Sequence, residues 1–311
     1  MISVVICTSH RLIYLENTIK DLIKINSIID KLIIFSFDDM ISIKIIRQKF
    51  SKRFKNLTII NGKSKDELEQ RIRSISMIDN NLIKDTKYIW FLSDKDRILN
   101  NKFVDIKKIL QKNINGLTMN VKSLKKNTPE TTNQNIYFDT FKLEKGVHKI
   151  GLISSNIIRT RLFLKYSKRT ELSAYYLSEI ILKIITFEKN WFFLKQKIIG
   201  YNHSDTDRTK NKIDPNYINY RLDQEFRFYI QKLNNITTIK NKKLKNKIIF
   251  RAFIKNIISW LSLLKEKDPI FFKKKIQHYK HYYNNYPSIK GIIFVLTYSP
   301  LFIINIIKKI K

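Results

Sequence analysis

Two carboxylates separated by one residue, Asp94 and Asp96, follow the apolar run YIWFL at 88–92 after a single serine, Ser93. Carboxylates at this spacing on a turn can share one divalent cation. Mg²⁺ and Mn²⁺ prefer oxygen ligands and keep room for phosphate oxygens. Such a metal would neutralise a diphosphate leaving group. A solvated acidic turn is the alternative interpretation, because a D-x-D sequence occurs easily by chance.

The elements that position these carboxylates follow from hydrophobic periodicity. Short apolar runs predict four buried strands: 3–7, 31–37, 57–60 and 88–92. Stretches with helical spacing lie between them: 12–25, 41–54 and 65–78. This alternation predicts parallel βαβ units, which bind ligands at the carboxyl ends of their strands. We therefore expect the polar residues that follow three of the strands to gather at one edge of the sheet.

The second half of the chain is less regular. Residues 117–142 are polar and turn-rich, which favours a hairpin or a mobile loop there. After it we expect a strand entering a helix (151–163), an apolar helix (174–187) and a strand running into a polar loop (191–211). From about 216 the pattern is helical and basic, so we expect a catalytic domain at 1–215 and a basic helical region at 216–311.

Three segments carry a resemblance to a known family. ISVVICTSHRLIYLENTIKDLI (2–23) and KYIWFLSDKDRIL (87–99) resemble two landmarks of family-two glycosyltransferases of the GT-A fold. GLISSNIIRTRLF (151–163) is similar to the acceptor-side segment of members that build surface polysaccharides. The resemblance covers about residues 2–210. It implies an α/β, GT-A-like fold, related to the Rossmann fold, with a mostly parallel sheet flanked by helices and followed by the basic helical C-terminal region.

Carried over residue by residue, the resemblance implies a donor-binding set: Thr8, Ser9, Arg11, Asp38, Asp39, Arg71, Arg73 and Asp94. Within it, Asp38 or Asp39 would contact the base or ribose, and Arg71 or Arg73 would hold a phosphate in a bidentate contact. Asp94 and Asp96 would bind Mn²⁺ or Mg²⁺. Helix N-capping is the alternative role for the acids at 38 and 39. The two arginines could equally be ordinary solvated helix residues.

An inverting transfer also needs a general base for the acceptor hydroxyl. The acidic pair with which the resembled family supplies it is absent here. Glu179 is the first candidate because it lies in the apolar helix 174–187, where its alternative role is to pair with a nearby lysine. Asp205 and Glu171 are the other candidates.

The segment around Asp205 has a second interpretation. His203, Asp205 and Arg208 could close over the donor phosphates, or they could form an ordinary surface loop.

Composition limits the compartment and the partners. The chain has 311 residues, 60 Lys and Arg against 26 Asp and Glu, and a formal net charge of +34. Biased coding toward Ile, Lys and Asn explains part of this charge. Nucleic acid or an anionic membrane face would explain its local clustering. The single Cys7 excludes an intramolecular disulfide and a four-cysteine zinc site, and no signal-peptide pattern opens the sequence, so we expect a cytoplasmic protein.

The C-terminal region suggests a membrane surface. Lysines alternate with aromatic residues between 240 and 290, and the uncharged run 291–307 lies between Lys290 and Lys308. Such a pattern favours an in-plane or re-entrant anchor on an anionic interface. A buried helical hairpin packed on the catalytic domain is the alternative.

These features together predict an enzyme on the inner face of the cell membrane. It would move a sugar from a nucleotide-sugar donor to a lipid-linked saccharide acceptor in capsule, O-antigen or lipooligosaccharide synthesis. The rival class is a basic nucleic-acid-binding protein without catalysis, which leaves the acidic cluster unused. A nucleotidyltransferase would share the metal site but would need a glycine-rich loop, which the sequence lacks. The oligomeric state stays open.

Overall fold

The computed structural model describes residues 1–8, 12–37, 40–54, 56–62, 74–83, 85–99, 103–124, 137–202, 215–236 and 241–299. The chain divides into two compact units. The first unit comprises Met1–Phe141 and Lys149–Thr206, and the second comprises Lys142–His148 and Asp207–Lys311. This division lies close to the expected boundary at 215/216, but it also assigns a short earlier segment to the second unit.

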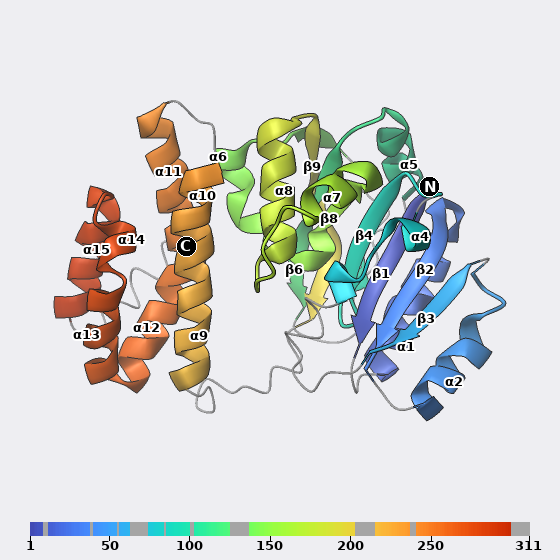
Figure 1. Cartoon of the computed structure of the whole chain (residues 1–311), viewed down its shortest axis with the longest axis horizontal. Helices are drawn as coiled ribbons and strands as arrows, with labels where there is room; N and C mark the ends of the chain where they lie inside the picture. Colours follow the sequence, from blue (N-terminus) through green and yellow to red (C-terminus); the bar gives the residue numbers. More distant parts are fainter. Residues whose placement is uncertain are drawn as a thin grey trace. The chain divides into compact units, whose positions relative to one another are not determined.

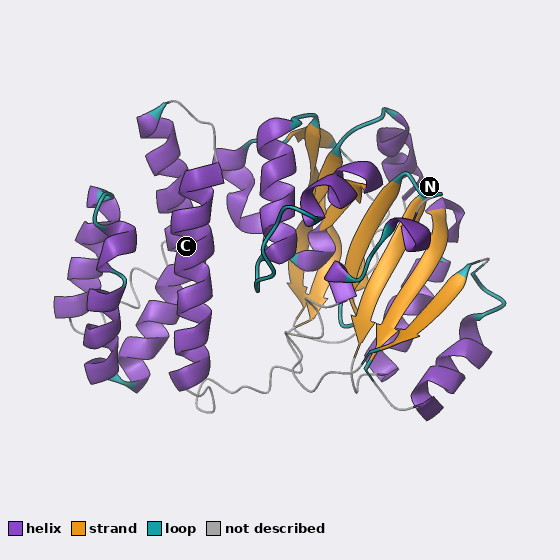
Figure 2. Cartoon of the chain, in the orientation of Figure 1, coloured by secondary structure: helices purple, strands orange, loops and turns teal. Residues whose placement is uncertain are grey.

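A sheet forms the centre of the first unit (Figures 1 and 2). Its strands in the described residues are β1 (Ile2–Thr8), β2 (Ile29–Ser36), β3 (Leu57–Asn61), β4 (Tyr88–Ser93), β5 (Arg97–Ile98), β6 (Gly116–Leu124), β7 (Phe138–Thr140), β8 (Asn156–Arg159) and β9 (Trp191–Asn202). They follow the order β3-β2-β1-β4-β8-β6-β9-β5, with β7 on β9. Strands β3, β2, β1 and β4 are parallel, as are β6 and β9, and the antiparallel pairings of β5, β7 and β8 are short. The predicted α/β architecture with a mostly parallel sheet is confirmed.

Helices cover both faces of this sheet. The longer ones are α1 (Leu12–Ile23), α2 (Met40–Phe50), α5 (Phe103–Gln111), α7 (Thr160–Ser167) and α8 (Tyr176–Phe187). One face buries Val4 and Ile6 of β1 in a cluster with Ile19 of α1. On the other face Phe91 of β4 packs on Phe163 of α7, with ring centroids 5.2 Å apart. Burial on both faces explains why these strands are continuous apolar runs.

The segment 117–142, predicted to include a hairpin or a mobile loop, contributes strands to the sheet. Residues 116–124 form strand β6 between β8 and β9, and residues 125–136 lie outside the described residues. Its polar Thr118 is fully buried and is satisfied by partners distant in sequence, since its hydroxyl donates to Asn156 Oδ1 at 2.8 Å and accepts from Trp191 Nε1 at 2.9 Å. A polar segment can be an interior strand when such partners exist. β7, at 138–140, pairs with β9 and not with β6.

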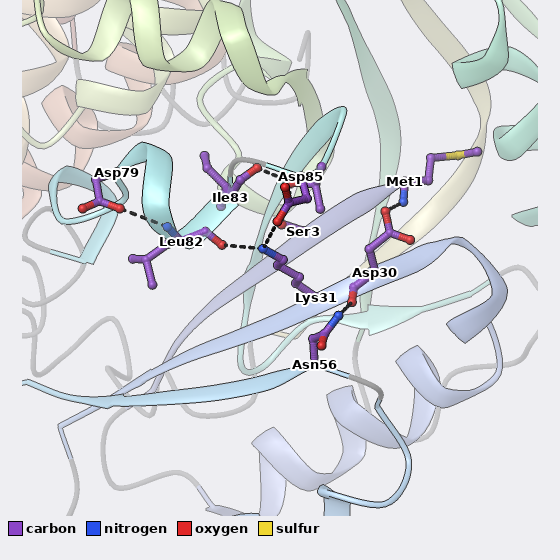
Figure 3. A network of polar contacts seen from close by, with 10 residues as sticks. Met1, Ser3, Asp30, Lys31, Asn56, Asp79, Leu82, Ile83 and Asp85 are labelled. Atoms are coloured by element: carbon purple, nitrogen blue, oxygen red, sulfur yellow. Dashed lines mark hydrogen bonds and ion pairs between the residues drawn. The ribbon is translucent and has the colours of Figure 1, made fainter.

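The amino edge of the sheet is held by polar contacts (Figure 3). Ser3 of β1 shares a 2.8 Å hydrogen bond with Thr86, just before β4. Lys31 of β2 reaches Asp85 at 3.3 Å and the carbonyl of Leu82, in helix α4 (Asn80–Ile83), at 3.4 Å. These bonds tie the approach to β4 onto its neighbours, so that β4 enters the sheet in register with β1. The carboxyl edge is the one where parallel sheets bind ligands.

The second unit is helical. Its main elements are α6 (Leu143–Gly146), α9 (Pro215–Phe226), α10 (Leu233–Ile236), α11 (Lys242–Ala252), α12 (Ile258–Lys267), α13 (Pro269–His278), α14 (Lys280–Tyr283) and α15 (Pro287–Tyr298). π-helical turns join α9 to α10 and α11 to α12. Phe226 stacks on Tyr279 at 4.2 Å in the core, and the Tyr279 hydroxyl donates to Asp223 at 2.8 Å. Within the described residues no helix has the length and apolar character needed to cross a bilayer.

Candidate active site

The carboxyl ends of β1, β2 and β4 lie at one level. Cys7 is the register partner of both Phe35 and Ser93, so Thr8 and Asp94 are the next residues on neighbouring strands. The Thr8 hydroxyl donates to Asp94 Oδ2 at 2.9 Å. The predicted gathering of polar residues at this edge is therefore observed for Thr8 and Asp94, which are 86 residues apart in sequence.

The acidic turn itself is buried. Asp94 is 1% exposed and Asp96 is 3% exposed. The Asp96 amide donates to the carbonyl of Ser93 at 3.2 Å, which closes the turn. An ionised carboxylate out of water is costly unless hydrogen bonds or a positive charge compensate it. Two such groups one residue apart form an electrostatically demanding site, and the alternative of a freely solvated acidic turn does not fit this burial.

Helix α1 supports the turn from one side through Thr18. The Thr18 hydroxyl lies 2.7 Å from the carbonyl oxygen of Asp94 and 2.9 Å from that of Asp96. Both contacts are to the backbone, so the hydroxyl holds the path of the turn and leaves the two carboxylates to other partners.

Asp21, one turn further along α1, binds the residues that follow. Its Oδ2 accepts from Arg97 Nε at 2.6 Å and from the amide of Ile98 at 3.1 Å, and its Oδ1 accepts from Arg97 Nη2 at 3.1 Å. Asp21 is 2% exposed. A bidentate pair of this kind is directional as well as strong. Thr18 and Asp21 together make α1 a rigid support for the acidic turn.

Thr18, Asp21 and Arg97 were not among the predicted site residues. The signal for the first two was present in the sequence, because both lie on the apolar face of α1 with Leu15 and Leu22. A buried polar group on such a face needs a partner. That the partner is the acidic turn depends on the strand order.

The segment 151–163 supports β4 from the other side. The Ser93 amide donates to Ser154 Oγ at 2.8 Å, and Trp90 Nε1 donates to the carbonyl of Ser154 at 2.8 Å. Ser154 belongs to a short 3-10 turn, Ile153–Ser155, directly before β8. The segment expected on the acceptor side therefore contacts the last residue before the acidic turn.

Glu179, the first candidate for the base, is in the first turn of α8 and is 4% exposed. Its Oε1 lies 3.0 Å from Lys183 Nζ. Lys183 also donates to the carbonyl of Arg169 at 2.9 Å and to the Thr170 hydroxyl at 3.0 Å. The pairing with a nearby lysine, expected as the alternative, is present within α8, and the other two contacts of Lys183 join α8 to the segment after α7.

Of the remaining candidate residues, the structure describes only Glu171. Glu171 is exposed and lies between α7 and α8. The others lie outside the described residues: Ser9, Arg11, Asp38, Asp39, Arg71, Arg73, His203, Asp205 and Arg208. In the described part of the chain no three His, Cys, Asp or Glu side chains form a group that could hold a metal ion. Asp94 and Asp96 would thus supply only part of a coordination shell.

Comparison with known proteins gives a fold. No protein-family model matches the sequence, and no curated protein matches it. Among solved structures, residues 1–349 of S. aureus TarS in complex with UDP-GlcNAc are similar with a TM-score of 0.56 at 12% identity, over 85% of this chain and 80% of that one. The Pyrobaculum calidifontis mannosyltransferase PcManGT in complex with GDP-Man and Mn²⁺ is similar with a TM-score of 0.52 at 7% identity, over 99% of this chain and 84% of that one. At these identities the likeness establishes the fold alone: the chain has the GT-A-like fold of these glycosyltransferases, as predicted.

Proposed function

We propose that this chain is a metal-dependent glycosyltransferase that moves a sugar from a nucleotide-diphosphate donor to an acceptor hydroxyl. The buried pair Asp94 and Asp96 carries the proposal, because it lies beside Thr8 at the carboxyl edge of a GT-A-like sheet. The two similar structures contain UDP-GlcNAc and GDP-Man with Mn²⁺, respectively. These ligands support a nucleotide sugar as the donor class. At such low identity they do not indicate which base it carries.

The acidic turn fits a divalent cation. Asp94 and Asp96 are buried and are hard oxygen donors, and a bound divalent cation stabilises two carboxylates in such a place. Since no third metal-binding side chain joins them in the described residues, oxygens of the donor diphosphate and water would complete the shell. When bound, Mn²⁺ or Mg²⁺ supplies positive charge to the departing diphosphate. Thr8 orients Asp94 by its hydrogen bond, and Thr18 holds the backbone of the turn.

The nucleotide would be held by the loops that follow the strands. Thr8 and Asp94 are the described members of that set. The Thr8 carbonyl accepts from the amide of Phe37 at 3.0 Å, which joins the ends of β1 and β2. The residues proposed with them are Ser9, Arg11, Asp38, Asp39, Arg71 and Arg73. The arginines would bind phosphate and the aspartates the base or ribose.

We assign the transfer as inverting. A general base takes the proton from the acceptor hydroxyl, the oxygen bonds to the anomeric carbon, and the bond to the diphosphate oxygen breaks on the opposite face. Glu179 and Asp205 are the candidates for this base. Because Glu179 pairs with Lys183, two roles are open to it. It is either a base that the lysine holds in position, or part of a structural link, through Lys183, between α8 and the segment after α7.

The acceptor would be a lipid-linked saccharide of capsule, O-antigen or lipooligosaccharide synthesis, met at the inner face of the cell membrane. The basic second unit supports this assignment. Residues 241–299 carry 13 Lys and Arg side chains and two carboxylates. A surface of this charge is attracted to anionic lipid. The same charge supports the rival function, a nucleic-acid-binding protein without catalysis, which has no use for the buried pair at 94 and 96.

A thermal-shift screen tests the proposed function. UDP, GDP, CDP and dTDP would each be added with and without Mn²⁺. Stabilisation follows RT ln(1 + [L]/Kd), about 2.7 kcal/mol at a hundredfold excess over Kd, so the donor base separates from the others. We expect one nucleotide to raise the melting temperature, and more strongly with Mn²⁺. Four nucleotides without effect in either condition would contradict the proposal.

A further inference from the structure

The second unit contains a hollow of about 580 Å³ between the starts of two helices. From α11 and its N-cap it is lined by Asn241, Lys243, Leu244, Asn246, Lys247 and Phe250. The facing wall is the start of α15, residues 286–289. Its volume is that of a small-molecule site. No carboxylate is among the lining residues.

Two exposed lysines concentrate positive charge in this groove. Lys243 and Lys247 are one helical turn apart, and like charges at this spacing repel each other. Lys243 lies in the first turn of α11, where the helix dipole is positive and no acidic residue is present, and Lys247 lies one turn further along. No described carboxylate pairs with either lysine. A bound anion would reverse each of these unfavourable terms.

Apolar and aromatic side chains also line the groove. Phe250 and Leu244 contribute from α11, and Tyr286 and Ile289 contribute from α15. The Tyr286 phenol, whose pKa burial raises, is protonated at neutral pH and can donate a hydrogen bond. A ligand that fits both the lysines and this lining therefore carries a negative group next to a hydrocarbon part.

We infer that this groove binds the phosphate of an anionic membrane phospholipid, with Lys243 and Lys247 on the phosphate and Phe250 and Tyr286 beside the glycerol and the first chain carbons. The inference deepens the membrane association proposed above and rests on it. General attraction to a bilayer would spread over all 13 basic residues of 241–299. Binding in the groove would instead depend mainly on Lys243 and Lys247.

The full-length chain with two matched double variants tests this. K243A/K247A removes the groove lysines, and K242A/K245A removes two lysines of the same helix that do not line the groove. Binding to vesicles of phosphatidylglycerol and phosphatidylcholine in equal parts is measured by co-sedimentation. Both variants lose the same net charge, so non-specific attraction predicts equal losses. We expect the groove pair to lose about tenfold more binding than the control pair.

A second measurement uses monomeric short-chain phosphatidylglycerol and inorganic phosphate in a thermal melt. We expect the lipid to stabilise the wild type and K242A/K245A but not K243A/K247A, and inorganic phosphate to stabilise none of them comparably. Equal losses by both pairs on vesicles, or an equal shift by inorganic phosphate, would overturn the inference. D94N separates it from the proposed function, because that variant should lose transfer and keep its vesicle binding.

Discussion

Asp21 of α1 and Arg97 of β5 are joined by a bidentate ion pair, with Nε to Oδ2 at 2.6 Å and Nη2 to Oδ1 at 3.1 Å. The pair spans 76 residues of sequence and lies directly after the acidic turn. Thr18, three residues earlier on the same helix, contacts the backbone of that turn. Helix α1 therefore fixes the backbone of the turn that carries Asp94 and Asp96.

Asp21→Asn should destabilise the protein and loosen the acidic turn. The amide keeps one acceptor oxygen but loses the charge that holds Arg97, and hydrogen bonds to charged groups are worth about 1.5 to 3 kcal/mol. Urea unfolding measures the loss. Lys24→Gln is the control, because Lys24 reaches Asp21 at 3.3 Å but is half-exposed, so its loss should stay below about 1 kcal/mol. Equal stability of Asp21→Asn and wild type would show that the pair does not support the turn.

Thr8→Val should weaken metal binding with little change of shape. It removes the hydroxyl that donates to Asp94 Oδ2, and loss of such an outer contact costs about 10- to 100-fold in metal affinity. Titration of Mn²⁺ in the presence of donor nucleotide measures this. Ser3→Ala, at the other end of the same strand, also loses a buried hydrogen bond but should leave the metal affinity unchanged. If both variants lowered the Mn²⁺ affinity equally, the effect would come from a general loss of stability and not from the Thr8–Asp94 hydrogen bond.

Asp94→Asn and Asp96→Asn should each abolish most transfer while the protein stays folded. Removing a group that stabilises charge in the transition state costs on the order of 10²-fold or more in rate. Turnover is measured at saturating donor. Asp105→Asn, which changes a half-exposed acid of α5 paired with Lys108, should keep wild-type turnover. Near wild-type rates in both acidic-turn variants would contradict the metal assignment.

The two roles of Glu179 are separated by Glu179→Gln and Lys183→Met. If Glu179 is the base, Glu179→Gln should lower kcat strongly with nearly unchanged donor affinity. Lys183→Met should mainly lower stability, by about 1 to 3 kcal/mol, because its bonds to the Arg169 carbonyl and the Thr170 hydroxyl hold α8 to the segment after α7. An active Glu179→Gln together with an inactive Asp205→Asn would transfer the role of base to Asp205.

Salt dependence separates the membrane enzyme from the nucleic-acid binder. Binding of the intact chain to anionic vesicles should fall only partly as salt rises, because apolar contacts are insensitive to screening. Oligonucleotide affinity would instead fall steeply with log salt, with a slope set by the phosphates neutralised. Tight oligonucleotide binding at physiological salt without any vesicle binding would favour the rival function.

Local pattern was sufficient for much of the first unit. The runs at 3–7, 57–60 and 88–92 became β1, β3 and β4, and 12–25 contains α1, because strands buried on both faces and amphipathic helices have different hydrophobic periods. The polar edge was predictable for the same reason, since parallel strands end together. Asp94 and Asp96 could thus be assigned to it from their position after β4.

Only the tertiary structure decided which partner each buried polar residue has. β6 contains polar residues that look like a loop, and it is an interior strand because Asn156 and Trp191, distant in sequence, satisfy Thr118. Asp21 lies on the apolar face of α1 and therefore needs a partner, but only the tertiary structure, which packs α1 against β5, shows that this partner is Arg97. Side-chain types and local periodicity show that a buried polar group needs a partner. Which partner it finds depends on contacts between distant segments, and no local pattern encodes those.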